Sequence, residues 1–559
     1  MLEPIVARFH AARTGAIAHP SLTGARILAR AFVVACMVIT SIPCAMAVGK
    51  PGEAGCERLR TVKIPNARIT SVEFVTSGSL APAGAFNFRG EPEVLKDLPR
   101  FCRVMGTSRP SADSQISFEV WLPEKWNGRY QQLGNGGWAG AIFYPRMGPA
   151  LIHGFVAAAT DDGHRGQIDD ASWALGHPEK LVDFGYRSGH ETNVAARALS
   201  AAFYGHTPKY AYFNGCSDGG REALISAQRY PDDFNGWVVG APANDWSRLL
   251  AGILRDAQLA SRASFSNVQL NLLTRAALRA CDAADGLADG IIANPLACNF
   301  DPHSLVCTPG RTEDCLSVAQ ADAAEAIYRG VSDPKSGVQI FPGLYGTMGT
   351  EADPVQWPLW ITGPRPLGLS IASSHFKYVV YAEPSLDIMH LDPIRALNDS
   401  RQRVDAVLSA LDPNLERVRV RGKKIIQYHG WSDSAIPADY SVSYYNTVAA
   451  GLGGDIRDFY RLFLAPAMAH CAGGPGPNAF GGADNPGAVY DAEHDVVAAI
   501  QRWVEEGQAP EHIIATKFEG DDPRGKVVRA RPLCVYPAVA KWTGKGSSDD
   551  PTNFVCTDP

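Results

Sequence analysis

The sequence predicts an α/β fold, with a mostly parallel sheet covered by helices and one large insertion. Short runs rich in β-branched and aromatic residues recur, and they end in Gly-rich or Asp-rich turns typical of strand ends. Helical patterns lie between these runs, and such alternation is typical of parallel sheets. The alternation stops in mid-chain and resumes later, which predicts an insertion into one core.

The predicted strands are short and apolar. In chain order they span residues 118–122, 130–133, 155–159, 210–213, 237–239, 424–428 and 459–463. Amphipathic patterns predict helices at residues 192–203, 221–229 and 493–506. The tail after Arg531 lacks either pattern, and we expect a loop there.

Residues 245–411 differ from the sequence on either side. They are irregular, rich in Pro, Trp and Gly, and contain four cysteines. We interpret them as a lid insertion, so that residues 48–244 and 412–559 form the two parts of the core. The length of 559 residues would also allow several separate domains.

The N-terminus is typical of an export signal. Arg26 and Arg30 precede an apolar run at residues 31–42, and small residues at 45–47 offer a cleavage site before Val48. The apolar run is short for a membrane span. We therefore expect residues 1–47 to be a signal peptide and the mature protein to be secreted or periplasmic.

Charge and cysteine content restrict the function classes. The net charge is −6 without a basic run, so nothing indicates a nucleic acid or a membrane surface as partner. Two of the twelve cysteines, Cys36 and Cys44, lie in the predicted signal, which leaves ten. An even number in an exported chain favours disulfides, and the absence of a Cys-x-x-Cys pair argues against zinc.

The strongest motif lies at residues 215–220 and fits Gly-x-Ser-x-Gly, with Ser217 as the serine. A strand is predicted before it and a helix after it, which is the context of a nucleophile on a strained turn. The backbone N–H of Asp218 would then face a developing oxyanion. The alternative is a Gly-rich turn with a buried serine.

A second oxyanion donor is expected on a loop after an earlier strand. The Gly-rich residues 134–137 follow the strand at 130–133, and Asn135 or Gly136 could offer a backbone N–H there. A tight turn without a catalytic role is the alternative.

An acid and a base in the required chain order complete the motif. Asp433 follows the strand at residues 424–428, and His470 follows the strand at 459–463. The carboxylate of Asp433 would fix the tautomer of His470, and His470 would take the proton of Ser217. A single Asp or His is more often structural, but the order Ser, Asp, His at strand ends is specific.

Two cysteines flank this predicted triad. Cys216 precedes Ser217 and Cys471 follows His470, so the two cysteines become neighbours if Ser217 and His470 meet. We expect them to form a disulfide that fixes the separation of two catalytic loops. Two small buried hydrophobic residues are the alternative.

The segment at residues 281–291 contains closely spaced carboxylates that would repel one another. Asp282, Asp285 and Asp289 alternate with glycines, and a hard cation such as Ca²⁺ would relieve the repulsion. The backbone carbonyls of Leu287 and Ile291 are further candidate ligands. A solvated acidic turn is the alternative.

Together these motifs resemble the tannase/feruloyl esterase family of α/β hydrolases. The resemblance rests on the Cys-Ser, Asp and His-Cys positions and covers nearly the whole mature chain. Its other motifs lie at residues 126–129, 134–140, 282–291, 428–430 and 531–534.

The resemblance implies an α/β-hydrolase core, a lid over the active site, a structural Ca²⁺ and no organic cofactor. It also implies disulfides between Cys56 and Cys102, Cys281 and Cys298, Cys307 and Cys315, and Cys534 and Cys556.

The resemblance further implies hydrolysis of aromatic-acid esters through an acyl-enzyme, with feruloyl esters first and galloyl or terephthalate monoesters as alternatives. Lid aromatics would face the acyl ring, and the candidates are Trp357, Trp360, Phe376 and Tyr378. Terephthalate esters are disfavoured because Ala372 stands where the terephthalate-ester enzyme has an arginine. A secreted serine peptidase and a non-catalytic phenolic- or carbohydrate-binding protein are the competing classes, and the oligomeric state stays open.

Overall fold

The computed structural model describes residues 52–82, 94–310 and 313–558. The predicted signal peptide, residues 1–47, lies outside the described residues. Within the described part of the chain, no helix is long and apolar enough to cross a membrane.

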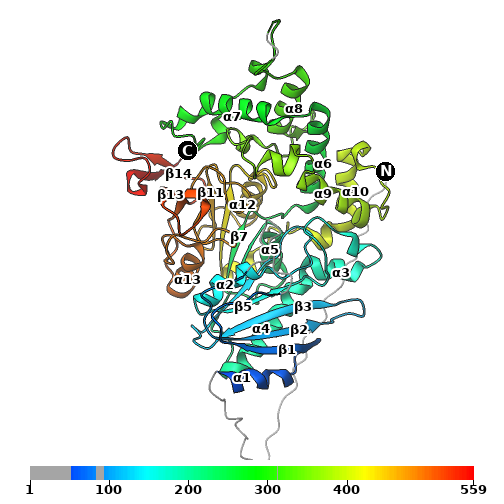
Figure 1. Cartoon of the computed structure of the whole chain (residues 1–559), viewed down its shortest axis with the longest axis vertical. Coiled ribbons are helices and arrows are strands. Elements are labelled where there is room, and N and C mark those ends of the chain that lie inside the picture. Colours follow the sequence, from blue (N-terminus) through cyan, green and yellow to red (C-terminus); the bar gives the residue numbers. More distant parts are fainter. Residues whose placement is uncertain (1–51, 83–93, 311–312, 559) are drawn as a thin grey trace, which may run out of the picture. The chain divides into compact units, whose positions relative to one another are not determined.

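A nine-stranded sheet forms the centre of the protein (Figure 1). Six neighbouring strands, from β5 to β11 in the sheet, run parallel, while β1, β2 and β3 pair antiparallel at one edge. The predicted mostly parallel sheet is therefore confirmed. In sheet order the strands are β1 (Ala67–Val75), β2 (Phe101–Ser108), β3 (Ile116–Pro123), β5 (Val156–Thr160), β4 (Arg129–Leu133), β6 (Tyr210–Cys216), β7 (Gly236–Gly240), β10 (Lys424–Gly430) and β11 (Tyr460–Ala465).

Helices cover both faces of this sheet because strand side chains alternate between two cores. Phe213 packs in one core with α4 (Ser188–Tyr204), α5 (Asp218–Arg229) and α12 (Asp439–Gly451). Tyr212 packs in the other core with α2 (Tyr144–Ile152) and α13 (Val496–Glu506). The sheet thereby holds the carboxyl ends of its parallel strands at one edge.

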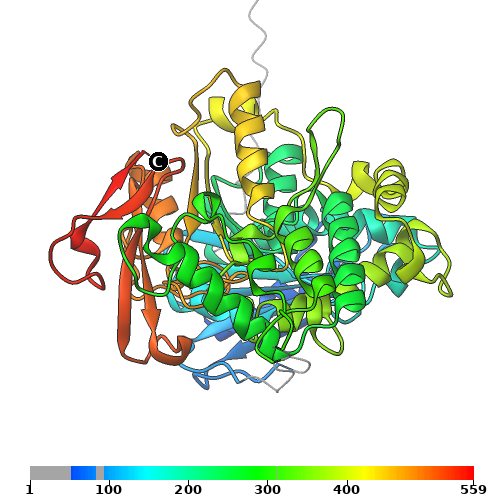
Figure 2. The same cartoon turned by 90° about the horizontal axis from the view of Figure 1, so that it is seen from above.

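The segment between β7 and β10 is mainly helical and contains the predicted insertion, residues 245–411. Its helices gather at one end of the sheet in Figure 1 and are seen from above in Figure 2. The segment contains α6 (Trp246–Ala263), α7 (Asn267–Cys281), α8 (Val318–Arg329), α9 (Leu367–Ser374), α10 (Pro393–Leu408), α11 (Glu416–Val420) and the short strands β8 (Val331–Ser332) and β9 (Gln339–Phe341). The remaining short helices are α1 (Glu53–Glu57) and α3 (Pro178–Val182).

The expectation of a loop after Arg531 was wrong. Strand β12 (His512–Phe518) pairs with β13 (Val527–Cys534), and β14 (Val539–Trp542) pairs with β15 (Phe554–Thr557). The last two strands have four residues each, and no residue of either is buried. Without a buried face these two strands carry no alternation of apolar and polar residues, so no strand pattern is present in their sequence.

All ten cysteines outside the predicted signal form disulfides, so none is available for zinc. The five expected pairings are confirmed: Cys56–Cys102, Cys216–Cys471, Cys281–Cys298, Cys307–Cys315 and Cys534–Cys556.

Candidate active site

Ser217 lies on a strained turn between β6 and α5. Its backbone has φ 67° and ψ −123°, in a region that residues with a side chain rarely adopt. Close backbone approaches require the glycines around it. A Cβ at Gly215 would lie 2.4 Å from the carbonyl oxygen of Gly219. The turn therefore projects the Ser217 hydroxyl beyond the end of the sheet.

Ser217, His470 and Asp433 meet at the carboxyl ends of three strands. The Nε2 atom of His470 lies 2.9 Å from Ser217 Oγ, and its Nδ1 atom lies 2.7 Å from Asp433 Oδ2. A proton on Nδ1 that is donated to Asp433 leaves Nε2 as an acceptor for the Ser217 hydroxyl. This arrangement can deprotonate the serine during attack on a carbonyl carbon.

Asp433 is fully buried yet held as a carboxylate. Its Oδ1 atom accepts the backbone N–H groups of Ala435 and Ile436, each at 2.8 Å. Burial would raise the pKa of Asp433, but the charge of His470 and the hydrogen bonds from His429 and His470 outweigh it. The pKa therefore lies well below its ordinary value. Asp433 thus stays ionised and can orient His470.

His429 is a neighbour of the site that the sequence reasoning missed. Its Nε2 atom lies 3.3 Å from Asp433 Oδ2 and 2.8 Å from the carbonyl oxygen of Ile436, while Nδ1 contacts Ser441 Oγ at 2.6 Å. The residue is wholly buried in β10. The sequence shows that His429 lies just before the turn that contains Asp433, but the direction of its ring depends on packing in the folded protein.

The oxyanion donors differ in availability. Within the described residues, the backbone N–H of Asp218 has no hydrogen-bond partner, so it is free for a ligand oxygen. The N–H of Asn135 is donated to Glu222 Oε2 at 3.1 Å, and that of Gly136 to Asn135 Oδ1 at 3.0 Å. Both predicted second donors are therefore already engaged. The loop is held by α5, which local sequence does not indicate.

A buried carboxyl cluster lies beneath this loop. Oxygens of Asp162, Asp218 and Glu222 lie within 4.8 Å of one another, and Arg221 pairs with Asp218 at 2.5 Å. Burial, with the charge of Asp218 added, raises the pKa of Glu222 to about 7. Burial also raises the pKa of Asp162 well above its ordinary value. The cluster therefore retains a proton where isolated carboxyls would lose it.

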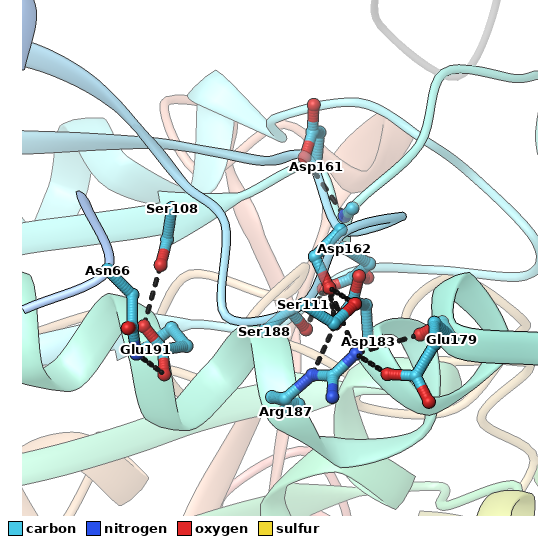
Figure 3. A network of polar contacts seen from close by, with 12 residues as sticks. Asn66, Ser108, Ser111, Asp161, Asp162, Glu179, Asp183, Arg187, Ser188 and Glu191 are labelled. Carbon is cyan, nitrogen blue, oxygen red and sulfur yellow. Dashed lines mark hydrogen bonds and ion pairs between the residues drawn. The ribbon is translucent and has the colours of Figure 1, made fainter. Parts of the chain in front are cut away.

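Further polar contacts hold the loop after β5 against α4. The Ser188 hydroxyl donates to Asp162 at 2.9 Å, and Arg187 pairs with Asp183 at 2.6 Å and Glu179 at 2.8 Å (Figure 3). The Ser188 bond fixes the Asp162 carboxyl, which lies close to Asp218 and Glu222 on α5.

The four lid aromatics are not equivalent. The ring of Trp360 meets that of His470 edge-on, with centroids 5.3 Å apart. Trp357 and Phe376 expose 0% of their surface and pack in lid cores, which does not fit the expected role in lining a substrate pocket. Tyr378 is half-buried. Ala372 is also fully buried.

Two further links brace the site. The Cys216–Cys471 disulfide holds their Cα atoms 6.0 Å apart, directly beside Ser217 and His470. Arg146 Nη1 donates to the carbonyl oxygens of Gly134 at 2.7 Å and Asn135 at 2.8 Å. The sequence reasoning missed Arg146, because an arginine inside an amphipathic helix gives no sign of what it contacts.

The acidic loop offers a candidate calcium site. Asp285, Leu287, Asp289 and Ile291 line a cavity of about 40 Å³, room for one ion and its nearest ligands. Burial raises the pKa of Asp285, and the charges of the neighbouring aspartates add to this effect. These oxygen donors fit a hard divalent cation.

The three predicted carboxylate ligands also have protein partners, and Asp285 accepts the backbone N–H of Leu287 at 2.9 Å. Asp282 accepts the backbone N–H groups of Asp289 at 3.2 Å and Gly290 at 3.0 Å, which closes the loop. Asp289 pairs with Arg531 at 2.5 Å and Arg529 at 3.3 Å. Asp285 is therefore the predicted carboxylate least committed to other groups.

Comparison with known proteins agrees with this geometry. A central sheet with the nucleophile on a strand-to-helix turn defines an α/β hydrolase. Residues 102–557 match the family described as tannase and feruloyl esterase. The chain belongs to this family of carboxylic ester hydrolases.

Individual relatives span nearly the whole chain. An uncharacterized esterase of Xanthomonas campestris pv. campestris is 38% identical over 567 residues, covering 96% of each chain. A mono(2-hydroxyethyl) terephthalate hydrolase of Piscinibacter sakaiensis is 32% identical, covering 90% of this chain and 92% of its own. The crystal structure of feruloyl esterase B from Aspergillus oryzae is 29% identical with a TM-score of 0.82, covering 90% and 99%.

Proposed function

We propose that this esterase is a secreted serine hydrolase of aromatic-acid esters, with feruloyl esters as its first substrate class. The observation that carries the proposal is the hydrogen-bonded chain from Asp433 through His470 to Ser217, at 2.7 and 2.9 Å. Such a chain generates a serine nucleophile for acyl transfer.

The reaction has two acyl-transfer steps. Ser217 Oγ attacks the ester carbonyl while His470 takes its proton, and the backbone N–H of Asp218 stabilises the oxyanion. His470 then gives the proton to the leaving alcohol, which forms the acyl-enzyme. Water activated by His470 releases the acid and restores Ser217. Asp433 stabilises the imidazolium that forms in both steps.

The aromatic acyl group is proposed from the lid and from the relatives. Trp360 lies against His470 and can pack on an aromatic ring bound at Ser217. The A. oryzae relative is a feruloyl esterase, and the P. sakaiensis relative acts on a terephthalate monoester. Ala372 carries no charge and is buried, so this position cannot hold a free terephthalate carboxylate. Feruloyl and galloyl esters therefore rank above terephthalate esters.

Export and calcium complete the proposal. Five disulfides suit an oxidising compartment, in agreement with the signal predicted at residues 1–47. Calcium would be held by the carboxylate of Asp285 and the carbonyls of Leu287 and Ile291, with Asp289 and Asp282 completing the loop. The ion would offset the clustered negative charge and fix the lid segment after α7.

The test is a substrate panel with a matched variant. Methyl ferulate, methyl gallate and mono(2-hydroxyethyl) terephthalate are each given to the wild type and to Ser217→Ala, and acid release is measured. We expect turnover of methyl ferulate by the wild type and a loss of about 10⁴-fold or more in Ser217→Ala. No turnover of any ester by folded wild type would refute the proposal.

A further inference from the structure

A cavity of about 950 Å³ opens on the face of the sheet covered by α2 and α13. Its rim includes exposed residues such as Gln167 and His153, and its floor reaches buried residues of β4 and β6. Ser217, Asp433 and His470 do not line it. The volume is in the range of small-molecule sites.

Two carboxamides form the floor of this cavity. Gln131 in β4 and Asn214 in β6 lie on the same face of adjacent paired strands, and they are 3% and 4% exposed. Within the described residues, neither side chain makes a hydrogen bond, and Asn214 Oδ1 is buried without a partner. A buried carboxamide oxygen is costly when it is unpaired, so Asn214 Oδ1, with the carboxamide of Gln131 beside it at the cavity floor, indicates a polar ligand.

The charges around the cavity favour a neutral ligand. Arg146 and Asp484, both lining residues, neutralise each other through paired contacts of 2.7 Å. The Asp495 carboxyl also lines the cavity, and burial raises its pKa to about 7. No lining cation is left to attract a carboxylate, since Arg146 is the only Lys or Arg among the lining residues.

We propose that this cavity binds a neutral saccharide unit. Carboxamides carry donors and acceptors together, and they match adjacent hydroxyl groups, which also do both. The stacked rings of His153 and Tyr490, with centroids 3.6 Å apart, add an apolar wall for the carbon face of a sugar.

We assign the saccharide to the alcohol part of the ester substrate. Only this assignment rests on the proposed function. The cavity and the catalytic site share a wall. Arg146 lines the cavity and also donates to the carbonyls of Gly134 and Asn135 in the loop beside Ser217. Under this assignment, a sugar ester places its alcohol in the cavity and its acyl group at Ser217.

The first experiment measures binding without turnover. Ser217→Ala protein is titrated with glucose, xylose and arabinose up to millimolar concentrations by calorimetry and ligand-observed NMR. We expect one of these sugars to bind, and Gln131→Leu and Asn214→Leu to weaken it about fivefold each through lost hydrogen bonds. Asn271→Leu, on an exposed face of α7, is the matched control and should bind the sugar as before. Binding that is unchanged in both floor variants overturns the proposal.

The second experiment identifies the source. The ratio of kcat/KM for a feruloylated monosaccharide to that for methyl ferulate is compared across the wild type, the two floor variants and Gln167→Trp. Gln167 is exposed at the rim, so its replacement narrows the entrance without a core change if the floor variants fold poorly. We expect the ratio to fall severalfold in each variant.

The outcomes separate the two claims. If sugars bind but the ratio of the two kcat/KM values is the same in all variants, the cavity is a saccharide site whose ligand is a free saccharide. A changed ratio without free-sugar binding supports the ester alcohol as the ligand. Neither sugar binding nor a changed ratio overturns the proposal. Wild-type inactivity on every ester of the panel refutes the proposed function instead, and the sugar titration still decides whether the cavity binds a saccharide.

Discussion

Arg146 donates two parallel hydrogen bonds to the carboxylate of Asp484, each with an N···O distance of 2.7 Å. Their side chains are only 3% and 8% exposed. Arg146 also holds the carbonyls of Gly134 and Asn135, while Asp484 belongs to the segment that follows His470. One buried cation therefore links the loop at residues 134–135 to the segment that follows His470.

Replacement of Arg146 should affect both stability and turnover. Arg146→Met leaves Asp484 buried without a partner, and we expect a loss of about 3–5 kcal/mol in the free energy of unfolding. We also expect kcat on methyl ferulate to fall about tenfold or more, because the loop carbonyls lose their donor. Denaturant unfolding and steady-state kinetics measure the two effects.

The double variant Arg146→Met/Asp484→Leu is the control for this pair. It removes both charges, so stability should recover in part, while kcat should stay low. Recovery of kcat together with stability would show that the ion pair only stabilises the fold.

Loss of the Cys216–Cys471 disulfide should reduce turnover before it abolishes folding. The bond closes a loop across 255 residues, which corresponds to about 5 kcal/mol in the chain-entropy model. We expect Cys216→Ala/Cys471→Ala to fold with a lower melting temperature and a kcat reduced about 10- to 100-fold. Thermal melts and kinetics on methyl ferulate measure both.

The matched control for that variant is Cys307→Ala/Cys315→Ala. This pair closes a separation of only 8 residues in the lid, so its kcat should stay near the wild-type value. Equal kcat values in the two double variants would contradict a role of the Cys216–Cys471 disulfide in positioning Ser217 and His470.

Asp495 should make stability depend on pH. Burial raises its pKa from 3.8 to about 7, so the folded protein keeps a proton that the unfolded chain releases. This group therefore lowers the free energy of unfolding as pH rises from about 4 to 7. Asp495→Asn keeps a good N-cap for α13 but cannot titrate.

Urea unfolding at a series of pH values tests this linkage. Between about pH 4 and 7, the free energy of unfolding of the variant should rise relative to that of the wild type by up to about 1.4 kcal/mol per pH unit. The difference should become constant above about pH 7. Parallel stability curves for the two proteins would contradict the raised pKa.

Removal of calcium should lower the melting temperature. A ligand that binds only the folded state stabilises it by mass action, so a chelator should lower the melt by several degrees and added Ca²⁺ should restore it. Asp285→Asn should reduce both responses, because Asp285 lines the 40 Å³ cavity. A melt that is indifferent to chelator and to Ca²⁺ would exclude the site.

The central strands and the three site residues could be predicted because their signals are local. Strand β7 is buried on both faces and reads as a short apolar run, and Ser217 carries its glycines beside it. Asp433 and His470 could be identified because they follow Ser217 in the expected order, each at the end of a later strand.

The hydrogen-bond partners of the oxyanion loop and the packing of the lid aromatics could not be predicted. Asn135 was expected to donate to an oxyanion, but Glu222 on α5 accepts its N–H. Trp357 and Trp360 are three residues apart in the lid, yet only Trp360 reaches His470. Which ring faces the site depends on how the lid packs on the core, and no local pattern encodes that packing.

The Cys216–Cys471 disulfide also sets the order in which the enzyme is assembled. Its second cysteine is synthesised 255 residues after the first, so the bond cannot form while the ribosome is still making the lid. A nascent chain or a fragment that ends before residue 470 contains Ser217 but neither His470 nor Cys471. The arrangement of Ser217 beside His470 with the Cys216–Cys471 bond closed therefore requires synthesis of the whole lid and of the segment up to Cys471, followed by oxidation of the two thiols.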